Sequence, residues 1–422
     1  MDERSNWDWE PGAKTVADLN EWKERYVWVE EPYARPDGEA VAAIVNIDEG
    51  EFTVCVNASP WEENTYDKIW HLRYLADGRL FAIISEMGEW TVSLDGEPWE
   101  TKFGYVWNPI FSGDGRHVAV SFQQDMQYGM ALNSRCWQNT YPTMTTTALS
   151  PDGAHAAAAV QVAGFGEADI QTFQKGCFTV AIDGDPWKQT FVNVWNMAFS
   201  PDGSRLAAEV RLNLYEYTIA VDGVPWNSVY NTVWEPVFHP TDGSVLAPVR
   251  LGGKWWLYRD GSPCWDRSFV QLWHPTFSAD GGRLAAVVAP KFGRWTVAVD
   301  GTPWTETFRD MVTDLVFSAD GSRLAALGKD GPAWKVAVDG KVWANAFDMA
   351  WKPVFSPDGK RIAAKVERQG NYTIAVDDCL WSRECEAIWN PTFSPDGERL
   401  LIRAVENGLF VRHVVPVTDI SG

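Results

Sequence analysis

The sequence is poor in basic residues and has no long apolar run. Its 422 residues include 36 Lys and Arg against 57 Asp and Glu, which gives a net charge of −21. Such an acidic surface repels nucleic-acid phosphates and anionic lipid head groups, so the composition predicts no nucleic-acid partner and fits a basic protein partner. The longest apolar stretches, such as 284–290, are far shorter than the ~20 residues of a membrane-spanning helix. The first residues are acidic without an apolar segment, so we expect a cytoplasmic protein with no direct membrane insertion.

The usual cofactor and catalytic motifs are also absent from the sequence. It contains no Cys-x-x-Cys, no Cys-x-x-Cys-His, no phosphate-binding Gly-rich motif and no Gly-x-Ser-x-Gly. The six histidines are scattered singly, and most aspartates belong to repeated turns. We therefore predict no cofactor, no metal and no catalytic residue. The six cysteines are interpreted as reduced, buried thiols, because a chain of this length needs no disulfides.

What dominates the sequence is a repeat of about 39 residues. Each unit has a Ser-Pro-Asp-Gly turn or a variant, and in most units a strand of the Arg-Leu-Ala-Ala type and a second β-branched strand follow. The second strand ends in another turn, which reads Asp-Gly-x-Pro-Trp at 95–99, 183–187, 222–226 and 300–304. Ser, Pro and Gly at these positions are typical of type I turns. Two further strands precede the next unit. Four short antiparallel strands per unit of this length indicate the blade of a β-propeller.

The 25 tryptophans follow the repeat, which gives them a structural interpretation. Ten follow the second turn, and four precede the second turn by five residues. Seven more stand four residues before the aromatic or equivalent residue of the strand that leads into the Ser-Pro-Asp-Gly turn. An electron-relay or sugar-stacking role is the functional alternative. Recurrence in every unit favours bulky aromatic wedges that fill the space between neighbouring blades.

The ends of the chain predict how the propeller closes. Trp22 stands 15 residues before Asp37, as Trp187 does before Asp202, whereas the last unit supplies only three strands and finishes near residues 409–415. Pairing of the N- and C-terminal strands would complete the last blade and cover exposed strand edges. We predict an all-β propeller of about ten WD40-like or TolB-like blades over 18–415, preceded by an arm (1–17) and followed by a tail (416–422). Two smaller rings are the alternative.

Two segments depart from the repeat and are candidate partner contacts. An insertion at about 160–177 lengthens one unit by about 11 residues. Within it we select Phe165, Ile170, Phe173 and Lys175, and we expect deletion of 164–174 to spare folding but weaken partner binding. The second segment is the arm, with Trp7 and Trp9. Tolerated insertion is an equally plausible interpretation of the first segment.

The repeats resemble WD40-like and TolB-like propeller repeats over almost the whole chain. The Asp-Gly-x-Pro-Trp turns and the tryptophan content further resemble the tryptophan-rich subunit of the transmembrane tetrahaem cytochrome c (Tmc) complex of sulfate-reducing bacteria. This resemblance implies a non-catalytic, cofactor-free accessory subunit on the inner face of the cytoplasmic membrane. It also implies partners: a membrane cytochrome b, a cytoplasmic iron–sulfur subunit and, indirectly, a periplasmic multihaem cytochrome c, in a chain that carries electrons to sulfate reduction.

A different class of function is an enzyme. Propellers also support hydrolases and lactonases, which use a carboxylate or metal site at the mouth of the central channel. A catalytic acid would break the repeat, because a residue common to all blades serves the fold. Metal content and turnover of esters or glycosides distinguish the enzyme from the scaffold.

Overall fold

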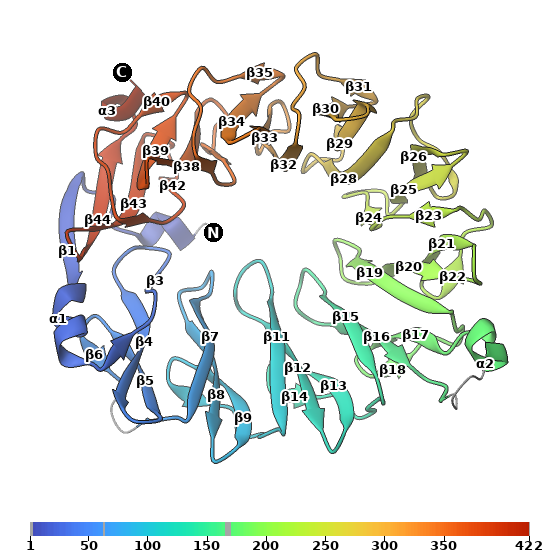
Figure 1. The fold of residues 1–422 in the computed structure, drawn as a ribbon, viewed down its shortest axis with the longest axis horizontal. Helices are drawn as coiled ribbons and strands as arrows, with labels where there is room; N and C mark the ends of the chain where they lie inside the picture. The colour runs from blue at the N-terminus through green and yellow to red at the C-terminus, as the bar shows by residue number, and fades with distance from the viewer. Residues whose placement is uncertain (1–2, 62–63, 165–169, 422) are drawn as a thin grey trace.

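Ten antiparallel β-sheets are arranged around a central channel in one closed ring (Figure 1). The computed structural model describes residues 3–61, 64–164 and 170–421. It confirms the predicted β-propeller, places all ten units in one ring, and rules out two smaller rings. Blades are numbered 1–10 in chain order, and blade 10 combines the last three strands with the first.

The inner strands line the channel, and the second strands form the centre of each blade (Figure 1). The inner strands are β2 (Trp28–Val29) with β3 (Tyr33–Ala34), β7 (Lys68–Tyr74), β11 (Tyr105–Phe111), β15 (Met144–Leu149), β19 (Asn193–Phe199), β23 (Thr232–Val233) with β24 (Val237–Phe238), β28 (Gln271–Phe277), β32 (Met311–Phe317), β36 (Met349–Ala350) with β37 (Val354–Phe355), and β41 (Ala387–Ile388) with β42 (Thr392–Phe393). The second strands are β4 (Val41–Asp48), β8 (Leu80–Glu86), β12 (Val118–Gln124), β16 (Ala156–Gln161), β20 (Leu206–Arg211), β25 (Val245–Leu251), β29 (Leu284–Lys291), β33 (Leu324–Asp330), β38 (Ile362–Arg368) and β43 (Arg399–Glu406).

The third and outer strands complete each sheet toward the rim. The third strands are β5 (Glu51–Val56), β9 (Glu89–Leu94), β13 (Gln127–Leu132), β17 (Phe178–Ile182), β21 (Tyr217–Val221), β26 (Lys254–Arg259), β30 (Arg294–Val299), β34 (Ala333–Val338), β39 (Asn371–Val376) and β44 (Leu409–Pro416). The outer strands are β6 (Ser59–Pro60), β10 (Glu97–Pro98), β14 (Arg135–Cys136), β18 (Asp185–Pro186), β22 (Val224–Pro225), β27 (Ser262–Pro263), β31 (Thr302–Pro303), β35 (Lys341–Val342), β40 (Cys379–Leu380) and, in blade 10, β1 (Gly12–Asp18).

Side-chain hydrogen bonds explain why the Ser-Pro-Asp-Gly turn recurs. In blade 8, the hydroxyl of Ser318 donates to Asp320 Oδ1 at 2.6 Å and accepts the backbone N–H of Arg323 at 2.9 Å. The same carboxylate accepts the N–H of Ser322. These hydrogen bonds, with that of Ser318 first, lower the pKa of Asp320 to about 2. The motif therefore closes the turn with its own side chains.

Apolar clusters between successive blades form the core of the ring. Between blades 7 and 8, Trp273, Trp295 and Trp304 from blade 7 pack against buried residues of blade 8 such as Phe308 and Leu324. The rings of Trp273 and Trp295 lie 4.4 Å apart, and the equivalent pair recurs in other blades. This arrangement confirms the predicted aromatic wedges.

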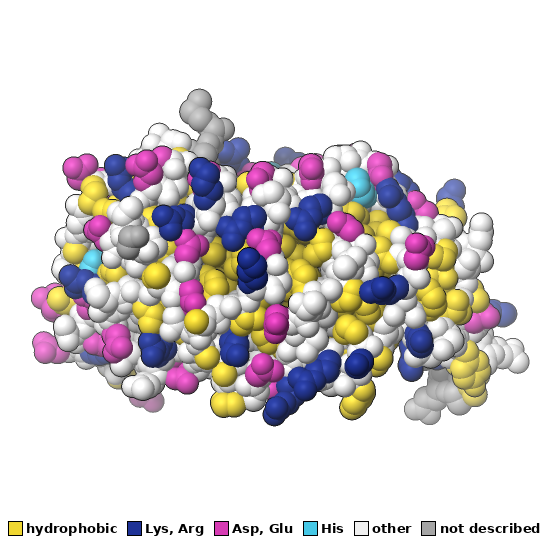
Figure 2. Space-filling view, turned by 90° about the horizontal axis from the view of Figure 1, so that it is seen from above, with side chains coloured by type: hydrophobic (Ala, Val, Ile, Leu, Met, Phe, Trp, Pro, Cys, Tyr) yellow, Lys and Arg dark blue, Asp and Glu magenta, His cyan; other side chains and the backbone are white. Residues whose placement is uncertain are grey.

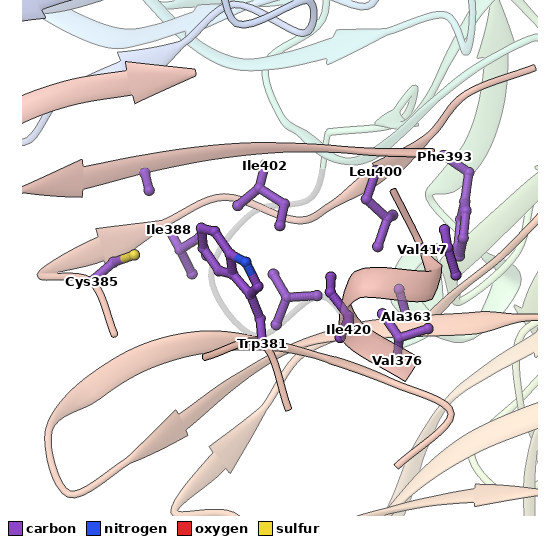
Figure 3. Packing of buried hydrophobic residues seen from close by; sticks show 12 residues of the cluster. Ala363, Val376, Trp381, Cys385, Ile388, Phe393, Leu400, Ile402, Val417 and Ile420 are labelled. Carbon is purple, nitrogen blue, oxygen red and sulfur yellow. The ribbon is translucent and has the colours of Figure 1, made fainter. Parts of the chain in front are cut away.

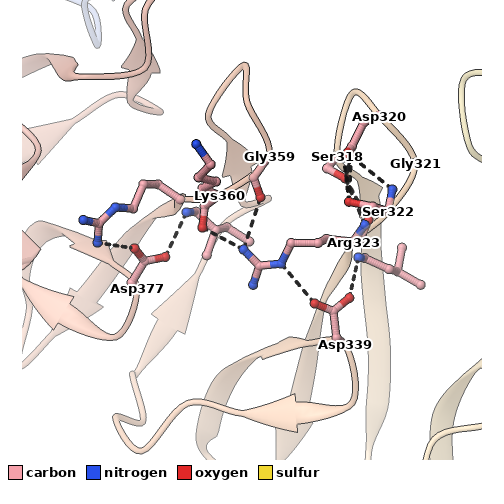
Figure 4. Close-up of polar contacts among 12 residues, drawn as sticks. Ser318, Asp320, Gly321, Ser322, Arg323, Asp339, Gly359, Lys360 and Asp377 are labelled. Carbon is pink, nitrogen blue, oxygen red and sulfur yellow. Dashed lines mark hydrogen bonds and ion pairs between the residues drawn. The ribbon is translucent and has the colours of Figure 1, made fainter.

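An arginine at the start of each of several second strands joins neighbouring blades (Figure 4). In blade 8, Arg323 Nε lies 3.0 Å from Asp339 Oδ2 in its own blade. Its Nη1 donates to the carbonyl oxygens of Gly359 (3.2 Å) and Lys360 (2.8 Å) in blade 9. Arg79, Arg205 and Arg283 make the same kind of bond to the next blade. The repeat thus encodes a polar link on the turns as well as an apolar core.

The N-terminal strand closes the ring as predicted. β1 pairs antiparallel with β44, from Gly12 opposite Val414 to Asp18 opposite Leu409. Residues 12–17, which the sequence interpretation assigned to the arm, therefore lie in the sheet of blade 10. Helix α1 (Leu19–Arg25) replaces the expected turn, with the Asp18 carboxylate accepting the N–H of Asn20 as its cap. Trp22 still fills the gap between blades, where it is 1% exposed.

The C-terminal residues pack on the ring. Helix α3 (Thr418–Ser421) covers the gap between blades 9 and 10, where Val417 and Ile420 contact the cluster around Trp381 (Figure 3). The expected tail from 416 thus contributes to the core. Of the six free cysteines, Cys55, Cys177 and Cys385 are buried, but Cys136 and Cys379 are exposed, which the expectation of buried thiols missed. No described helix has the length and apolar character needed to span a membrane.

Candidate functional site: the loop face and the channel

The disc has two chemically different faces. We call the turn face the one that carries the Ser-Pro-Asp-Gly and Asp-Gly turns, where inner strands pass to second strands and third strands pass to outer strands. We call the loop face the opposite one, with the hairpins between second and third strands and the connections between blades. Seen edge-on, the two faces are separated by the thickness of the blades (Figure 2).

Exposed large apolar side chains gather on the loop face. Among the described residues, all but one of these side chains belong to hairpins, to blade connections or to strand ends at this face. They are Val27, Trp28, Ile47, Trp70, Met87, Tyr105, Met126, Val162, Ile170, Leu214, Tyr215, Val229, Trp234, Leu251, Val270, Phe292 and Met311. The exception, Val224, lies at a turn. Phe292 is 93% exposed and Met87 90%. The loop face is therefore the more apolar of the two faces in its exposed large side chains.

An apolar cavity opens on the same face between blades 1 and 2. Its volume is about 830 Å³, and Trp28, Phe52 and Trp70 line it together with Ile44. Trp28 is 50% exposed and Trp70 38%. Lys68 Nζ lies 5.8 Å from the centroid of Trp70, so a cation borders the aromatic wall. The cavity can accept an apolar side chain of a partner.

The charges of the loop-face hairpins change sign around the ring. In blades 1–3 the exposed hairpin charges are acidic: Asp48, Glu49, Glu51, Glu86, Glu89 and Asp125. In blades 6 and 7 they are basic: Lys254, Lys291 and Arg294. Phe292 thus projects between two cations on a chain that is acidic overall. A partner on this face would be oriented by both signs of charge.

Trp7 and Trp9 lie on the turn face. Their rings stack with centroids 6.0 Å apart, and Trp9 Nε1 donates to the carbonyl oxygen of Arg4 at 2.9 Å. Trp7 lines a cavity of about 410 Å³ together with the turns of blades 1 and 2. Arg412 donates to the carbonyl oxygen of Asp8, so the arm is attached to blade 10.

The insertion lies on the opposite side, at the loop face of blade 4. It contains helix α2 (Ile170–Lys175), in which Ile170 is 63% exposed and no residue is buried. Phe173 and Lys175 belong to the same helix, whereas Phe165 lies outside the described residues. Val162 N donates to the carbonyl oxygen of Cys177 at 2.8 Å, which closes the base of the insertion. The two segments selected from sequence therefore do not form one site.

The sequence interpretation missed a group of ionisable side chains beside the channel. Glu209 is 6% exposed, and Asn196 Nδ2 donates to its Oε2 at 2.9 Å. Burial, opposed by this hydrogen bond and reinforced by Glu235, raises the pKa of Glu209 to about 7. The nearby Glu235 carboxylate pairs with His274 Nδ1 at 3.1 Å, which lowers the pKa of Glu235 and raises that of His274.

The repeat itself carried a signal for Glu209. The fourth residue of the second strand is apolar or small in most blades, including Ile83, Val287 and Leu327, so a carboxylate there breaks the pattern. The described residues contain no group of three or more His, Cys, Asp or Glu side chains arranged to hold a metal.

No protein-family model and no curated protein matches the chain. Among solved structures, a eukaryotic initiation factor is similar with a TM-score of 0.46 and 15% identity, covering 81% of this chain and 92% of that one. The Swd1 β-propeller domain of Myceliophteria thermophila is similar with a TM-score of 0.30 and 15% identity, covering 65% of this chain and 96% of that one.

Proposed function

We propose that the protein is a non-catalytic scaffold that binds a partner protein over its loop face. The observation that carries this proposal is the concentration of exposed apolar side chains on that face. The apolar cavity between blades 1 and 2 opens on the same face. A rigid ring holds such groups in place before binding, which reduces the entropy lost on association. The turn face, by contrast, is occupied by hydrogen-bonded turns.

We further propose that the partners are subunits of a membrane-bound electron-transfer complex of the Tmc type. These are a membrane cytochrome b and an iron–sulfur subunit, with the periplasmic multihaem cytochrome c reached indirectly. The support is the resemblance of the Asp-Gly-x-Pro-Trp repeats, together with an apolar face able to attach the disc peripherally to partners at the inner side of the cytoplasmic membrane.

The test compares the two faces. The full-length protein is purified with its companions from native membranes, the companions are identified, and the dissociation constant for each is measured. The triple variant Met87→Ser, Met126→Ser, Phe292→Ser should weaken binding at least tenfold, because each fully buried side chain contributes about 1.5–3 kcal/mol. Val224→Ser, on the turn face, is the control and should bind normally. Unchanged binding by the triple variant contradicts docking over the loop face.

A second candidate is a hydrolase with its acid at the channel, which the near-neutral pKa of Glu209 favours. Its test is turnover of ester and glycoside substrates by the wild type and by Glu209→Gln. Turnover that this substitution abolishes would support the enzyme, and turnover that survives it would remove Glu209 as the acid.

A further inference from the structure

Two cations that interrupt the repeat line one cavity, where blades 9, 10 and 1 meet. At the repeat position that Val287 and Leu327 occupy in other blades, blade 9 has Lys365 and blade 10 has Arg403. The cavity has a volume of about 410 Å³, and Tyr372 and Trp389 supply aromatic walls. This volume suits a small molecule.

Arg403 is a buried cation that forms no ion pair with any residue the structure describes. Its residue exposure is 9%, and its Nη1 and Nη2 donate to the carbonyl oxygens of Arg35 (3.3 Å) and Asn390 (2.7 Å). Its Nε is buried and has no hydrogen-bond partner. Burial lowers the pKa of Arg403 to about 10, against the longer-range attraction of Asp37. Because an unpaired buried charge is costly, an anion in the adjoining cavity would stabilise this arginine.

Lys365, on the blade 9 side of the cavity, likewise has no ion-pair partner among the described residues. Its Nζ lies 4.2 Å from the ring centroid of Trp351 and 4.8 Å from that of Tyr372. Glu31 and Glu367 act on it electrostatically, but within the described part of the chain it forms no ion pair. Burial lowers the pKa of Lys365. Two cations that have no ion-pair partner among the described residues therefore line one small cavity.

The carboxylates of the cavity lie at its outer side. Glu31 and Glu386 line it too, and both residues are exposed, whereas Arg403 is buried and Lys365 is half-buried. We propose that the cavity binds a small zwitterion, with its acidic group between Lys365 and Arg403 and its ammonium group at Glu31 and Glu386. The carbon skeleton would contact the aromatic walls. The cavity lies on the same side of the ring as the apolar cavity between blades 1 and 2, but its proposed ligand is a small molecule whose binding requires no partner protein.

The experiment is calorimetric titration of the full chain with the twenty common α-amino acids. The best-binding amino acid is then compared with its analogue lacking the amine, its analogue lacking the carboxylate, and inorganic phosphate. We expect both single-charge analogues and phosphate to bind at least tenfold more weakly than the zwitterion. If no amino acid binds, or if the amine-free analogue or phosphate binds as tightly, the proposal is overturned.

Substitution at Lys365 locates the site. Lys365→Met should weaken binding at least tenfold without lowering the melting temperature, because apolar residues stand at this position in other blades. The matched control is Lys329→Met: Lys329 Nζ also lies over an aromatic ring, 5.2 Å from the centroid of Trp334, but it does not line the cavity. Binding that survives Lys365→Met, or that Lys329→Met weakens equally, overturns the assignment.

Discussion

At the residue scale, one contact links the second turn of several blades to the preceding blade. The glycine of the turn adopts a left-handed conformation and lies against the turn tryptophan of the blade before it, as Gly340 does against Trp304. The same contact recurs between Gly223 and Trp187. In these blades the motif thus supplies both a tryptophan for the next blade and a glycine that receives the tryptophan of the previous one.

Replacing such a glycine should lower the free energy of unfolding by more than the backbone strain alone. Gly340 has a φ of +77°, and a Cβ there would lie 3.3 Å from Trp304 Cγ. Gly370 has a φ of +81° with nothing within 4 Å of a Cβ, so it is the matched control. Each change to Ala should cost about 1 kcal/mol through the positive φ. We expect thermal unfolding to show a clearly larger loss for Gly340→Ala, and equal losses would exclude the tryptophan contact as a source of stability.

The buried carboxylate of Glu209 should make stability depend on pH. Its pKa is raised from 4.5 to about 7 in the folded protein, so the folded state binds the proton more tightly than the unfolded state. The resulting stabilisation is present below pH 4.5 and is lost as the pH rises through 7. Glu209→Gln cannot ionise and still accepts the hydrogen bond of Asn196. From pH 5 to pH 8 the free energy of unfolding, measured in denaturant, should therefore fall by roughly 2–3 kcal/mol less in the variant than in the wild type. Parallel pH profiles would contradict this account.

At the scale of elements, β1 differs from the other outer strands. It pairs over most of its length with β44, whereas an outer strand such as β10 makes only two residue pairs with its neighbour. Deleting residues 2–18 removes β1 and exposes the edge of β44, so we expect a lower melting temperature and concentration-dependent aggregation in light scattering. Deleting residues 2–9 removes only the arm and should leave the protein monomeric. Similar behaviour of the two truncations would contradict closure by β1.

The elements also show how far the sequence could predict the structure. The turns, the four strands per blade and the closing pair were predictable because short-range turn chemistry and alternating apolar residues repeat in every unit. Helix α1 was missed because Asp18 follows the spacing of a turn aspartate but acts as a helix cap. The interblade role of Arg323 was missed because its partners, the carbonyl oxygens of Gly359 and Lys360, have no sequence signature.

The candidate sites were less predictable than the fold. The residues selected from the sequence lie in segments that depart from the repeat: Trp7, Trp9, Ile170, Phe173 and Lys175. Such a departure reveals an added segment but not the face of the ring on which the segment lies. A single charged residue within a strand is a weaker signal, because the rest of the strand still follows the repeat. This is the case for Glu209, Lys365 and Arg403. The burial of these residues, and the cavity that Lys365 and Arg403 share, depend on which blades become neighbours in the closed ring.

At the scale of the whole molecule, the two faces differ in chemical character. The turn face is stabilised by hydrogen bonds within turns and between blades, so its polar groups are largely satisfied by the fold. The loop face carries the apolar tips and therefore the docking surface of the proposed function. Modification of one face should then leave the other face functional.

The exposed thiols provide a test of this division. Cys136 and Cys379 are free and exposed in the outer strands β14 and β40, beside the turns. Alkylation with a bulky polyethylene-glycol maleimide should leave partner binding unchanged, because these strands border the turn face. In a Cys136→Ser, Cys379→Ser background, Met126→Cys places the same label on a loop-face hairpin, and labelling should weaken binding at least tenfold by steric exclusion. If the label at the native thiols blocks the partner, or the label at position 126 does not, the partner docks on the turn face or the rim instead.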